Sequence, residues 1–474
     1  MSATFVEGAI MRVRRIVVVI VVSLTVGAST LVGQGGGQFQ GGGRGRAGGP
    51  PPPPSNLPEA PTAVALPMIS AEVTGPGPIF DSAPSLAPGK GLDAFKYEAH
   101  EYFVSGTANG EPYTTRIVVR KPADTAKFSG LVLAEAMHGS GAAHMFEFTS
   151  IYTMSSGHAA VEILTTPPAQ FVDLNEARYR SLKLTGAQTN EILAQIGSLV
   201  RSGSLVGGPV RKMVLAGTSM TAGVLINYLP AHMVYRTPQM QRIYDGFLPM
   251  SNGAMIRDID VPIVHVPTMH EVSGNITNRQ DGDEPGKQYR LYEFAGMGHI
   301  DTRDSVRMKP NPCAQPLSRF PEQAFMSVAL DHLFTWVDQG KVPPRADRIL
   351  LDRNEYNDGS MMALDEHGNA RGGIRSTYVD VPTARYTIRP AAATPVVPNA
   401  SAYIARGGQQ AANLMCGLST AQLDFTAAQL KTMYKSKQAF VKAVETRLTE
   451  LEKAGWSLPL YREMILGDAA KVSF

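Results

Sequence analysis

The sequence predicts an α/β fold in which helices cover both faces of a mostly parallel central sheet. Short, continuous apolar runs such as 130–135 and 213–216 are typical of strands buried on both faces. Segments with apolar residues at helical spacing, such as 190–200, alternate with these runs. Alternating strands and helices favour a parallel sheet, and functional residues then gather at the carboxyl ends of its strands.

The strands can be followed in chain order. Residues 95–107 and 113–120 have strand-like composition, and Asn109-Gly110 between them is typical of a tight hairpin turn. Six further segments are predicted to be strands of the sheet: 130–135, 158–165, 213–216, 244–250, 261–267 and 289–294.

Helices are predicted between and after these strands. Apolar spacing indicates a helix at 190–200, and helix-compatible residues fill 222–229. A further amphipathic segment, 324–339, stops at Gly340, a residue that favours helix ends.

The C-terminal part is predicted to extend the same domain. We expect a small hairpin over 365–381 that turns at His367-Gly368-Asn369. Two helices are predicted between 425 and 455, broken near Lys435-Ser436. The α/β domain is therefore expected to span 66–474 and to end in a helical segment from about 400.

The N-terminus has the pattern of a signal peptide. Arginines at 12, 14 and 15 precede the apolar stretch 16–26, and the small residues 27–29 follow it. This order of charged, apolar and small residues predicts a signal peptide over 1–28. A membrane anchor is the alternative, but eleven helical residues span only about 16 Å, half a bilayer. We expect an exported protein that has no membrane association after cleavage.

Residues 29–65 are predicted to form a low-complexity linker. Repeated glycines are followed by five prolines at 50–54. Glycine-rich chains are flexible and proline-rich chains are stiff, and neither composition can bury a core.

Charge and cysteine content narrow the range of partners. A formal net charge of +3, without a Lys/Arg-rich run inside the body, argues against nucleic acid. The two cysteines are too few for a structural zinc site, and no paired Cys or His spacing accompanies them, so we expect no metal or other cofactor. In an exported chain we predict that Cys313 and Cys416 form a disulfide, the alternative being two buried thiols.

The segment 211–223 resembles the context of a catalytic serine. It reads RKMVLAGTSMTAG, a buried strand followed by a tight turn and a helix, with Ser219 in the turn. A strand, a sharp turn and a helix form a nucleophile elbow, which exposes the serine hydroxyl. Thr221 stands at the second glycine of G-x-S-x-G, and Gly223 comes two residues later. A serine in such a turn can also be a simple turn residue, but the flanking strand and helix favour the nucleophile.

A base and an acid follow in the order that sheet-based serine hydrolases use. Glu271 comes after the strand 261–267, and His299 ends a glycine-rich turn after 289–294. We predict His299 as the base and Glu271 as the acid that orients it. His270 is expected to be a neighbour of the acid and not the base. Three other acidic residues in the next loop remain alternatives for the acid: Asp281, Asp283 and Glu284.

The oxyanion hole is expected to use backbone N–H groups. One donor would be Met220, directly after the nucleophile, and the other would come from Gly139 or Ser140 in the loop after 130–135.

These motifs resemble those of the α/β-hydrolase domain family of secreted bacterial proteins. The elbow of that family reads G-x-S-x-S, close to the GTSMT at 217–221. Its E-x-x-N-x-S-G segment matches 135–141, with His138 in place of the asparagine. Its Q-T-E-T-D-like segment matches 267–272, and its E-x-A-G-x-x-H turn matches 293–299. The resemblance runs from about 69 to the C-terminus and includes the Cys-Gly-Leu at 416–418. It implies an α/β-hydrolase fold with Ser219 as nucleophile.

The expected function is therefore an exported serine esterase. Ser219 would form an acyl-enzyme with a small-molecule carboxylic ester, and water would release the acid. Two alternatives remain at this stage: an acyltransferase, in which an alcohol replaces the water, and a catalytically silent binding protein that kept the fold.

Overall fold

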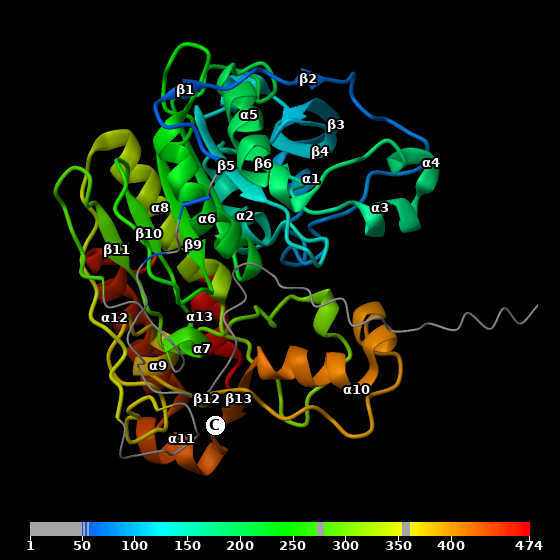
Figure 1. The fold of residues 1–474 in the computed structure, drawn as a ribbon. Coiled ribbons are helices and arrows are strands. Elements are labelled where there is room, and N and C mark those ends of the chain that lie inside the picture. The colour runs from blue at the N-terminus through cyan, green and yellow to red at the C-terminus, as the bar shows by residue number, and fades with distance from the viewer. Residues whose placement is uncertain (1–49, 51–52, 55, 273–278, 353–360) are drawn as a thin grey trace, which may run out of the picture. The chain divides into compact units, whose positions relative to one another are not determined.

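A nine-stranded mixed sheet forms the centre of the computed structural model of this protein (Figure 1). The structure describes residues 50, 53–54, 56–272, 279–352 and 361–474. From one edge to the other the strands are β11 (Tyr289–Leu291), β10 (Ile263–His265), β9 (Gly246–Met250), β7 (Lys212–Thr218), β5 (Leu131–Ala136), β6 (Ala159–Ile163), β4 (Glu111–Pro122), β3 (Tyr97–Ala108) and β2 (Met68–Ile69).

The strands from β11 to β6 are parallel to one another, and β4, β3 and β2 pair in antiparallel fashion. In register, Val214 pairs with Gly246, and Ile263 pairs with both Phe247 and Tyr289. Because the parallel strands share one direction, the carboxyl ends of β5, β7, β10 and β11 lie along one edge of the sheet. The predicted site residues follow these four strands.

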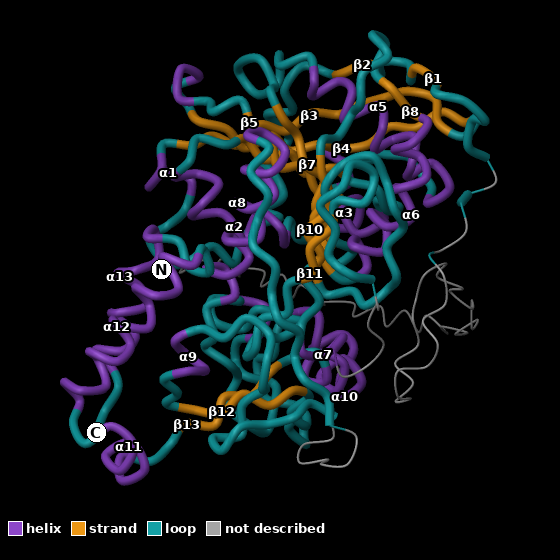
Figure 2. Tube along the Cα trace, turned by 90° about the vertical axis from the view of Figure 1, so that its left-hand side faces the viewer, coloured by secondary structure: helices purple, strands orange, loops and turns teal. Residues whose placement is uncertain are grey.

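Helices cover both faces of the sheet, as the sequence predicted. Figure 2 shows α2 (His144–Ser155) and α8 (Glu322–Gln339) on one side of the strands, and α5 (Thr189–Arg201) and α6 (Met220–Val234) on the other. Contacts agree with this view, since α2 packs against α8 and α5 packs against α6. Gly340 adopts a left-handed conformation at the end of α8, which confirms the predicted helix stop.

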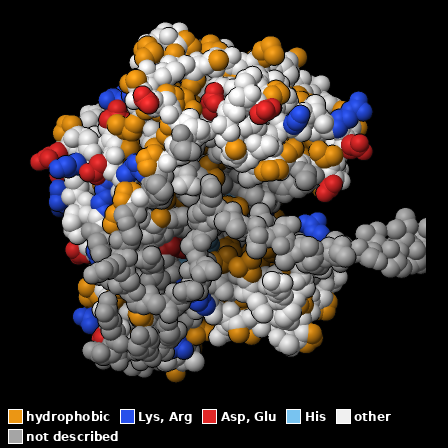
Figure 3. Space-filling view, in the orientation of Figure 1, with side chains coloured by type: hydrophobic (Ala, Val, Ile, Leu, Met, Phe, Trp, Pro, Cys, Tyr) orange, Lys and Arg blue, Asp and Glu red, His pale blue; other side chains and the backbone are white. Residues whose placement is uncertain are grey.

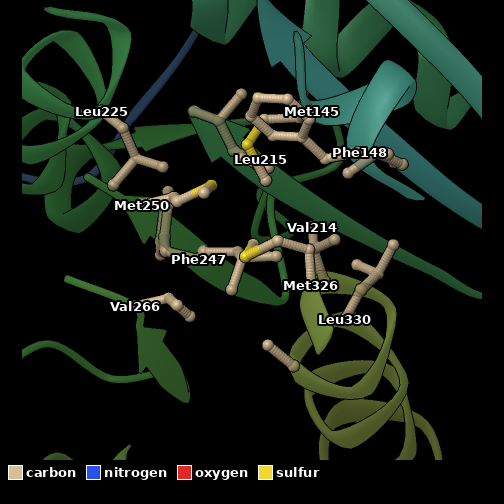
Figure 4. Packing of buried hydrophobic residues seen from close by; sticks show 14 of the residues in the cluster. Met145, Phe148, Val214, Leu215, Leu225, Phe247, Met250, Val266, Met326 and Leu330 are labelled. Atoms are coloured by element: carbon tan, nitrogen blue, oxygen red, sulfur yellow. The ribbon is translucent and has the colours of Figure 1, made fainter. Parts of the chain in front are cut away.

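The core lies between the sheet and these helices. Figure 4 shows part of it, where Val214 of β7 lies beside Met326 and Leu330 of α8. All three side chains are fully buried. Burying a side chain of this size stabilises a fold by about 1.5–3 kcal/mol, an upper figure because the unfolded chain already buries part of it.

The predicted strands and their turn are confirmed along the whole sheet. Asn109 and Gly110, with φ of 52° and 76°, form the turn between β3 and β4. A two-residue type I′ hairpin turn requires positive φ at both central residues, and Asn-Gly favours this turn for that reason.

The C-terminal part corrects one prediction. The predicted turn at His367-Gly368-Asn369 is present, because Leu364 bridges Ala370 around it. The hairpin does not extend to 381, since α9 (Thr377–Asp380) follows. The two-stranded antiparallel sheet is instead formed by β12 (Ala384–Ile388) and β13 (Thr420–Asp424). These strands are separated by α10 (Ala402–Gly417), so local patterns could not reveal their pairing.

The predicted C-terminal helices are confirmed. α11 (Ala427–Tyr434) and α12 (Lys437–Ala454) are separated by Lys435-Ser436. Lys435 has a φ of 67°, and the Ser436 hydroxyl accepts the Ala439 N–H at the start of α12. Helix α13 (Arg462–Lys471) follows.

The remaining elements are short. They are β1 (Thr62–Ala63), which pairs with β8 (Tyr235–Arg236), the helices α1 (Leu92–Phe95), α3 (Ala169–Leu174), α4 (Glu176–Tyr179) and α7 (Met269–Val272), and the 3-10 turns Thr125–Lys127, Gly186–Gln188, Val306–Met308 and Pro459–Tyr461.

The described residues all belong to one compact unit. The predicted signal peptide at 1–28 and most of the linker at 29–65 lie outside the described residues. Across the described ranges, no helix is both long and apolar enough to cross a membrane. Figure 3 shows acidic and basic side chains interspersed on one face of the described chain.

Candidate active site

Ser219 occupies a strained turn between β7 and α6. Its φ is 55° and its ψ is −120°, a conformation that costs a residue with a side chain on the order of 1–3 kcal/mol. The turn is held to the neighbouring strand because the Ser219 N–H donates to the Met250 carbonyl at 3.0 Å. This strand–turn–helix geometry is the one that a nucleophile elbow requires.

Two residues beside the serine allow the turn to be this tight. A Cβ on Gly217 would lie only 2.5 Å from the Thr221 carbonyl oxygen, so no larger residue fits there without a backbone shift. The Thr221 hydroxyl accepts the Thr218 N–H at 3.0 Å and donates to the Thr218 carbonyl at 2.9 Å. Thr221, which departs from G-x-S-x-G, therefore stabilises the elbow through its own side chain.

The structure brings Ser219, His299 and Glu271 into one hydrogen-bonded line. The Ser219 Oγ lies 2.9 Å from His299 Nε2, and His299 Nδ1 lies 2.6 Å from Glu271 Oε1. His299 follows β11 and Glu271 lies in α7 after β10, so each side chain comes from the carboxyl end of a parallel strand. The arrangement allows the imidazole to take the serine proton while the carboxylate fixes its tautomer.

The environment of Glu271 keeps it ionised. Its second oxygen, Oε2, accepts both the Thr268 N–H at 2.8 Å and the Thr268 hydroxyl at 2.6 Å. Burial by itself raises the pKa of the Glu271 carboxyl, but the charge and hydrogen bond of His299 outweigh it and bring the pKa to about 2. Sequence reasoning missed Thr268, although T-x-x-E at 268–271 is the signature of a capping box.

The structure does not bring the alternative acids to His299. Asp283 pairs with Arg290 at 2.6 Å and with Arg345 at 2.7 Å. Asp281 accepts the Leu291 N–H at 3.1 Å. Glu284 accepts the Lys287 N–H through its backbone carbonyl at 2.9 Å, within the same loop.

The candidate oxyanion donors lie on two facing segments. Met220 is the first residue of α6. The N–H groups in the first turn of a helix have no hydrogen-bond partner within that helix, so the Met220 N–H can bind a substrate oxygen. A Cβ on Gly139 would lie 2.9 Å from the Met220 sulfur, which places the loop after β5 directly against the elbow. The Ser140 N–H instead donates to His138 Nδ1 at 3.1 Å. The Ser140 N–H is therefore engaged elsewhere, and Met220 and Gly139 stay the candidate donors.

A hydrogen-bond network around His138 holds this loop, and sequence reasoning missed its more distant members His144 and Glu147. The Ser140 Oγ lies 2.8 Å from His138 Nδ1 and 3.3 Å from His144 Nε2. His144 Nδ1 donates to Glu147 at 2.9 Å, and the Arg307 guanidinium donates to the same carboxylate at 3.1 Å. Burial, together with the nearby charges, lowers the pKa of His138 to about 3. A neutral His138 can accept the Ser140 N–H, so the network fixes the loop beside the oxyanion position.

The structure joins Cys313 and Cys416 in a disulfide. The S–S distance is 2.01 Å and the Cα atoms are 5.6 Å apart. Ile300 and Leu317 pack against this pair, and Ile300 directly follows His299. The disulfide therefore lies close to the base in space.

A cavity of about 560 Å³ lies elsewhere, against α12, α13 and β13. Two arginines that line this cavity form ion pairs within it: Arg303 pairs with Asp468 at 2.6 Å, and Arg319 pairs with Asp424 at 2.9 Å. In the described part of the chain, no three His, Cys, Asp or Glu residues come together as metal ligands. The Ser219 line is thus the strongest candidate for chemistry.

Several solved structures are similar to part of this chain. Among solved structures, the chain is similar to the esterase Est22, at 12% identity and a TM-score of 0.26 over 36% of this chain and 48% of that one. It is also similar to a cold-adapted esterase from an Arctic intertidal metagenomic library, at 13% identity and a TM-score of 0.24 over 41% and 83%. A hyperthermophilic esterase from the archaeon Pyrobaculum calidifontis is similar at 13% identity and a TM-score of 0.22, over 33% and 43%.

The chain spans about half the length of Est22. A search of curated proteins found no match. The sequence model of the family described as "Alpha/beta hydrolase domain" matches residues 64–466. That match covers most of the chain, so the protein belongs to the alpha/beta hydrolase domain family.

Proposed function

We propose that this member of the family is an exported serine hydrolase that cleaves small-molecule carboxylic esters. The observation that carries the proposal is the continuous line from Ser219 Oγ to His299 Nε2, at 2.9 Å, and from His299 Nδ1 to Glu271, at 2.6 Å. A serine hydroxyl becomes a useful nucleophile when such a base and acid stand beside it.

In the first half-reaction His299 takes the Ser219 proton as the serine oxygen attacks the ester carbonyl. The N–H groups of Met220 and Gly139 stabilise the negative charge on the carbonyl oxygen. The bond between the acyl carbon and the alkoxy oxygen then breaks. His299 returns its proton to the leaving alcohol, and the acyl group remains on Ser219.

In the second half-reaction water takes the place of the alcohol. His299 accepts a proton from the water, the new oxygen attacks the acyl carbon, and the Ser219 oxygen leaves with the proton that His299 returns. If an alcohol entered in place of water, the same residues would catalyse acyl transfer.

The strain at Ser219 favours an enzyme over a silent binding protein. A positive φ on a non-glycine residue costs free energy and persists where the surroundings over-determine it. Here Gly217, Thr221 and the bond to Met250 hold the serine in that conformation. The strained turn also directs the Ser219 hydroxyl to within 2.9 Å of His299 Nε2, a contact that catalysis uses and ligand binding does not require.

Export is supported by the charged, apolar and small-residue order of 1–28. A disulfide is also a feature of proteins in oxidising compartments. We therefore propose that the mature enzyme works outside the cytoplasm. Cell fractionation followed by mass spectrometry tests this, because a chain found only in the cytoplasm with an uncut N-terminus would contradict it.

A fluorophosphonate probe tests the catalytic proposal directly. We expect the native protein to be labelled at Ser219 and the Ser219→Ala variant to remain unlabelled. A panel of p-nitrophenyl esters of rising acyl length then reports the preferred acyl group. Native protein that takes no label and turns over no ester would support the silent binding protein. Added alcohols that divert the acyl group into a new ester would support the acyltransferase.

A further inference from the structure

The C-terminal segment packs directly behind the catalytic histidine. Figures 1 and 2 both place α7, which contains His270 and Glu271, beside β12 and β13, although β13 is far away in the sequence. The contact is made through His270 and through the turn that leads to His299.

Both ring nitrogens of His270 are engaged. Its Nδ1 accepts the backbone N–H of His299 at 3.2 Å, and its Nε2–H donates to the Ser419 carbonyl at 3.1 Å. The residue is fully buried, and this burial lowers its pKa to about 3. His270 is therefore neutral, and the two bonds select the tautomer with the proton on Nε2.

Ser419 is itself held in place. Its N–H donates to the Cys416 carbonyl at 3.0 Å, and its hydroxyl donates to the Met415 carbonyl at 2.7 Å. The Arg389 N–H, next to β12, donates to the same Ser419 carbonyl at 3.0 Å. Cys416 is bonded to Cys313, so the acceptor of the His270 proton lies three residues from the disulfide.

The turn before His299 touches the same segment a second time. A Cβ on Gly298 would lie 2.5 Å from the Thr420 hydroxyl oxygen, so β13 and the turn are in close contact. On its other side, the Gly298 N–H donates to Glu322 of α8 at 2.9 Å. A displacement of β13 would therefore displace the turn that leads to His299.

We propose that His270 is a positioning residue, which links the backbone of His299 to the C-terminal segment that the disulfide anchors. The inference rests on the proposed function, because it assigns His299 the role of base. The chemical reason is geometric: proton transfer needs His299 Nε2 at its 2.9 Å from Ser219, and an error of about 1 Å can cost on the order of 100-fold in rate.

Two substitutions of His270 separate positioning from stability. In His270→Asn the amide oxygen takes the place of Nδ1 and keeps the acceptor for the His299 N–H. In His270→Gln the amide nitrogen takes the place of Nε2 and keeps only the bond to Ser419. Each variant loses one of the two hydrogen bonds, so a purely structural role predicts similar melting temperatures and similar kcat for both.

We expect unequal kinetics. The kcat of His270→Gln, which loses the bond to His299, should fall on the order of 10-fold while KM changes little. The kcat of His270→Asn, which keeps that bond but loses the bond to Ser419, should fall only about 3-fold. Equal kcat values in the two folded variants would overturn the inference.

Reduction of the disulfide in the native protein gives a second test that needs no substitution. Opening the Cys313–Cys416 bond should lower the kcat of the parent by about 3-fold or more. It should have a smaller effect in His270→Gln, since coupled sites are not additive. A reduced parent that keeps its full kcat would contradict the anchoring step, whether or not the variants fold.

A spectroscopic measurement distinguishes failure of this inference from failure of the proposed function. The low-field NMR signal of the His299 Nδ1 proton, which is bonded to Glu271, reports the position of the ring without any turnover. It should shift in His270→Gln more than in His270→Asn. If the parent neither takes the fluorophosphonate nor hydrolyses esters, the proposed function fails. The signal then still tests the link, and equal shifts would refute it.

Discussion

Ser219 has a strained backbone conformation and is also the candidate nucleophile. Its hydroxyl is the atom that we propose attacks the ester, so Ser219→Ala should lower kcat/KM by about 10⁴-fold or more. Alanine fits the same turn with a smaller side chain, and we expect the circular dichroism spectrum and the melting temperature to remain close to those of the parent. Hydrolysis of p-nitrophenyl acetate within tenfold of the parent would place the nucleophile elsewhere.

Removal of the acid, Glu271, should lower kcat less than removal of the base, His299. Glu271→Gln keeps a group that can still accept a hydrogen bond from His299, whereas His299→Ala removes proton transfer altogether, so its loss in kcat should be larger. Asp283→Asn is the matched control, because Asp283 is paired with Arg290 and Arg345 and not with His299. A crippled Asp283→Asn enzyme together with an unaffected Glu271→Gln enzyme would reverse the assignment of the acid.

The low pKa of Glu271 predicts a pH-dependent contribution to stability. Its folded pKa is about 2, below its ordinary value of 4.5, so the unfolded chain binds more protons between these values. The contribution is therefore complete above about pH 4.5 and is lost as the pH falls toward 2. Urea unfolding should show a stability difference between the parent and Glu271→Gln that narrows from pH 6 to pH 3. A constant difference would show that the carboxylate is not the source.

At the scale of elements, the junction of β7 and α6 sets how tightly the elbow can turn. Gly217→Ala would place its Cβ 2.5 Å from the Thr221 carbonyl oxygen, and relieving that clash must move the backbone beside Ser219. We expect a lower melting temperature and a lower kcat, with a cost in folding free energy of about 1–3 kcal/mol.

Gly223→Ala is the control for that prediction, because it makes the same chemical change inside α6, on the other side of the elbow from Gly217 in β7. Its Cβ would lie 3.9 Å from the Asn252 side chain, an ordinary contact. Alanine also favours helices over glycine by up to about 1 kcal/mol. The stability and activity of this variant should match or exceed those of the parent, and an equal loss in both variants would show that the elbow is not specially tight.

At the scale of the whole molecule, the disulfide ties the C-terminal segment to the loop after the base. It links residues that are 103 positions apart. Closing a loop of that length stabilises a fold by up to about 4–5 kcal/mol in the chain-entropy model. The Cys313→Ser/Cys416→Ser double variant should therefore unfold at a lower urea concentration than the oxidised parent. Thiol titration of the denatured, unreduced parent checks the bond itself, since two free thiols would contradict it.

Local sequence patterns predicted the sheet because a strand that is buried on both faces is a continuous run of apolar residues. The continuous apolar runs that became β5, β6, β7 and β9 are buried on both faces, and such strands have a recognisable composition. The turn at Asn109-Gly110 and the helix stop at Gly340 depend on φ preferences that single residues express. The pairing of β12 with β13 joins segments far apart in the sequence, and no local signal encodes it.

The sequence by itself determined the fold class, the elbow at Ser219 and the order of a serine, an acid and a histidine after parallel strands. These depend on local composition and on chain order. Only the tertiary structure decided which acid meets His299, that the Ser140 N–H is turned toward His138, and that His270 joins His299 to Ser419. The physical reason is distance along the chain: His270 and Ser419 are 149 residues apart, and a hydrogen bond between them exists only after the chain has folded.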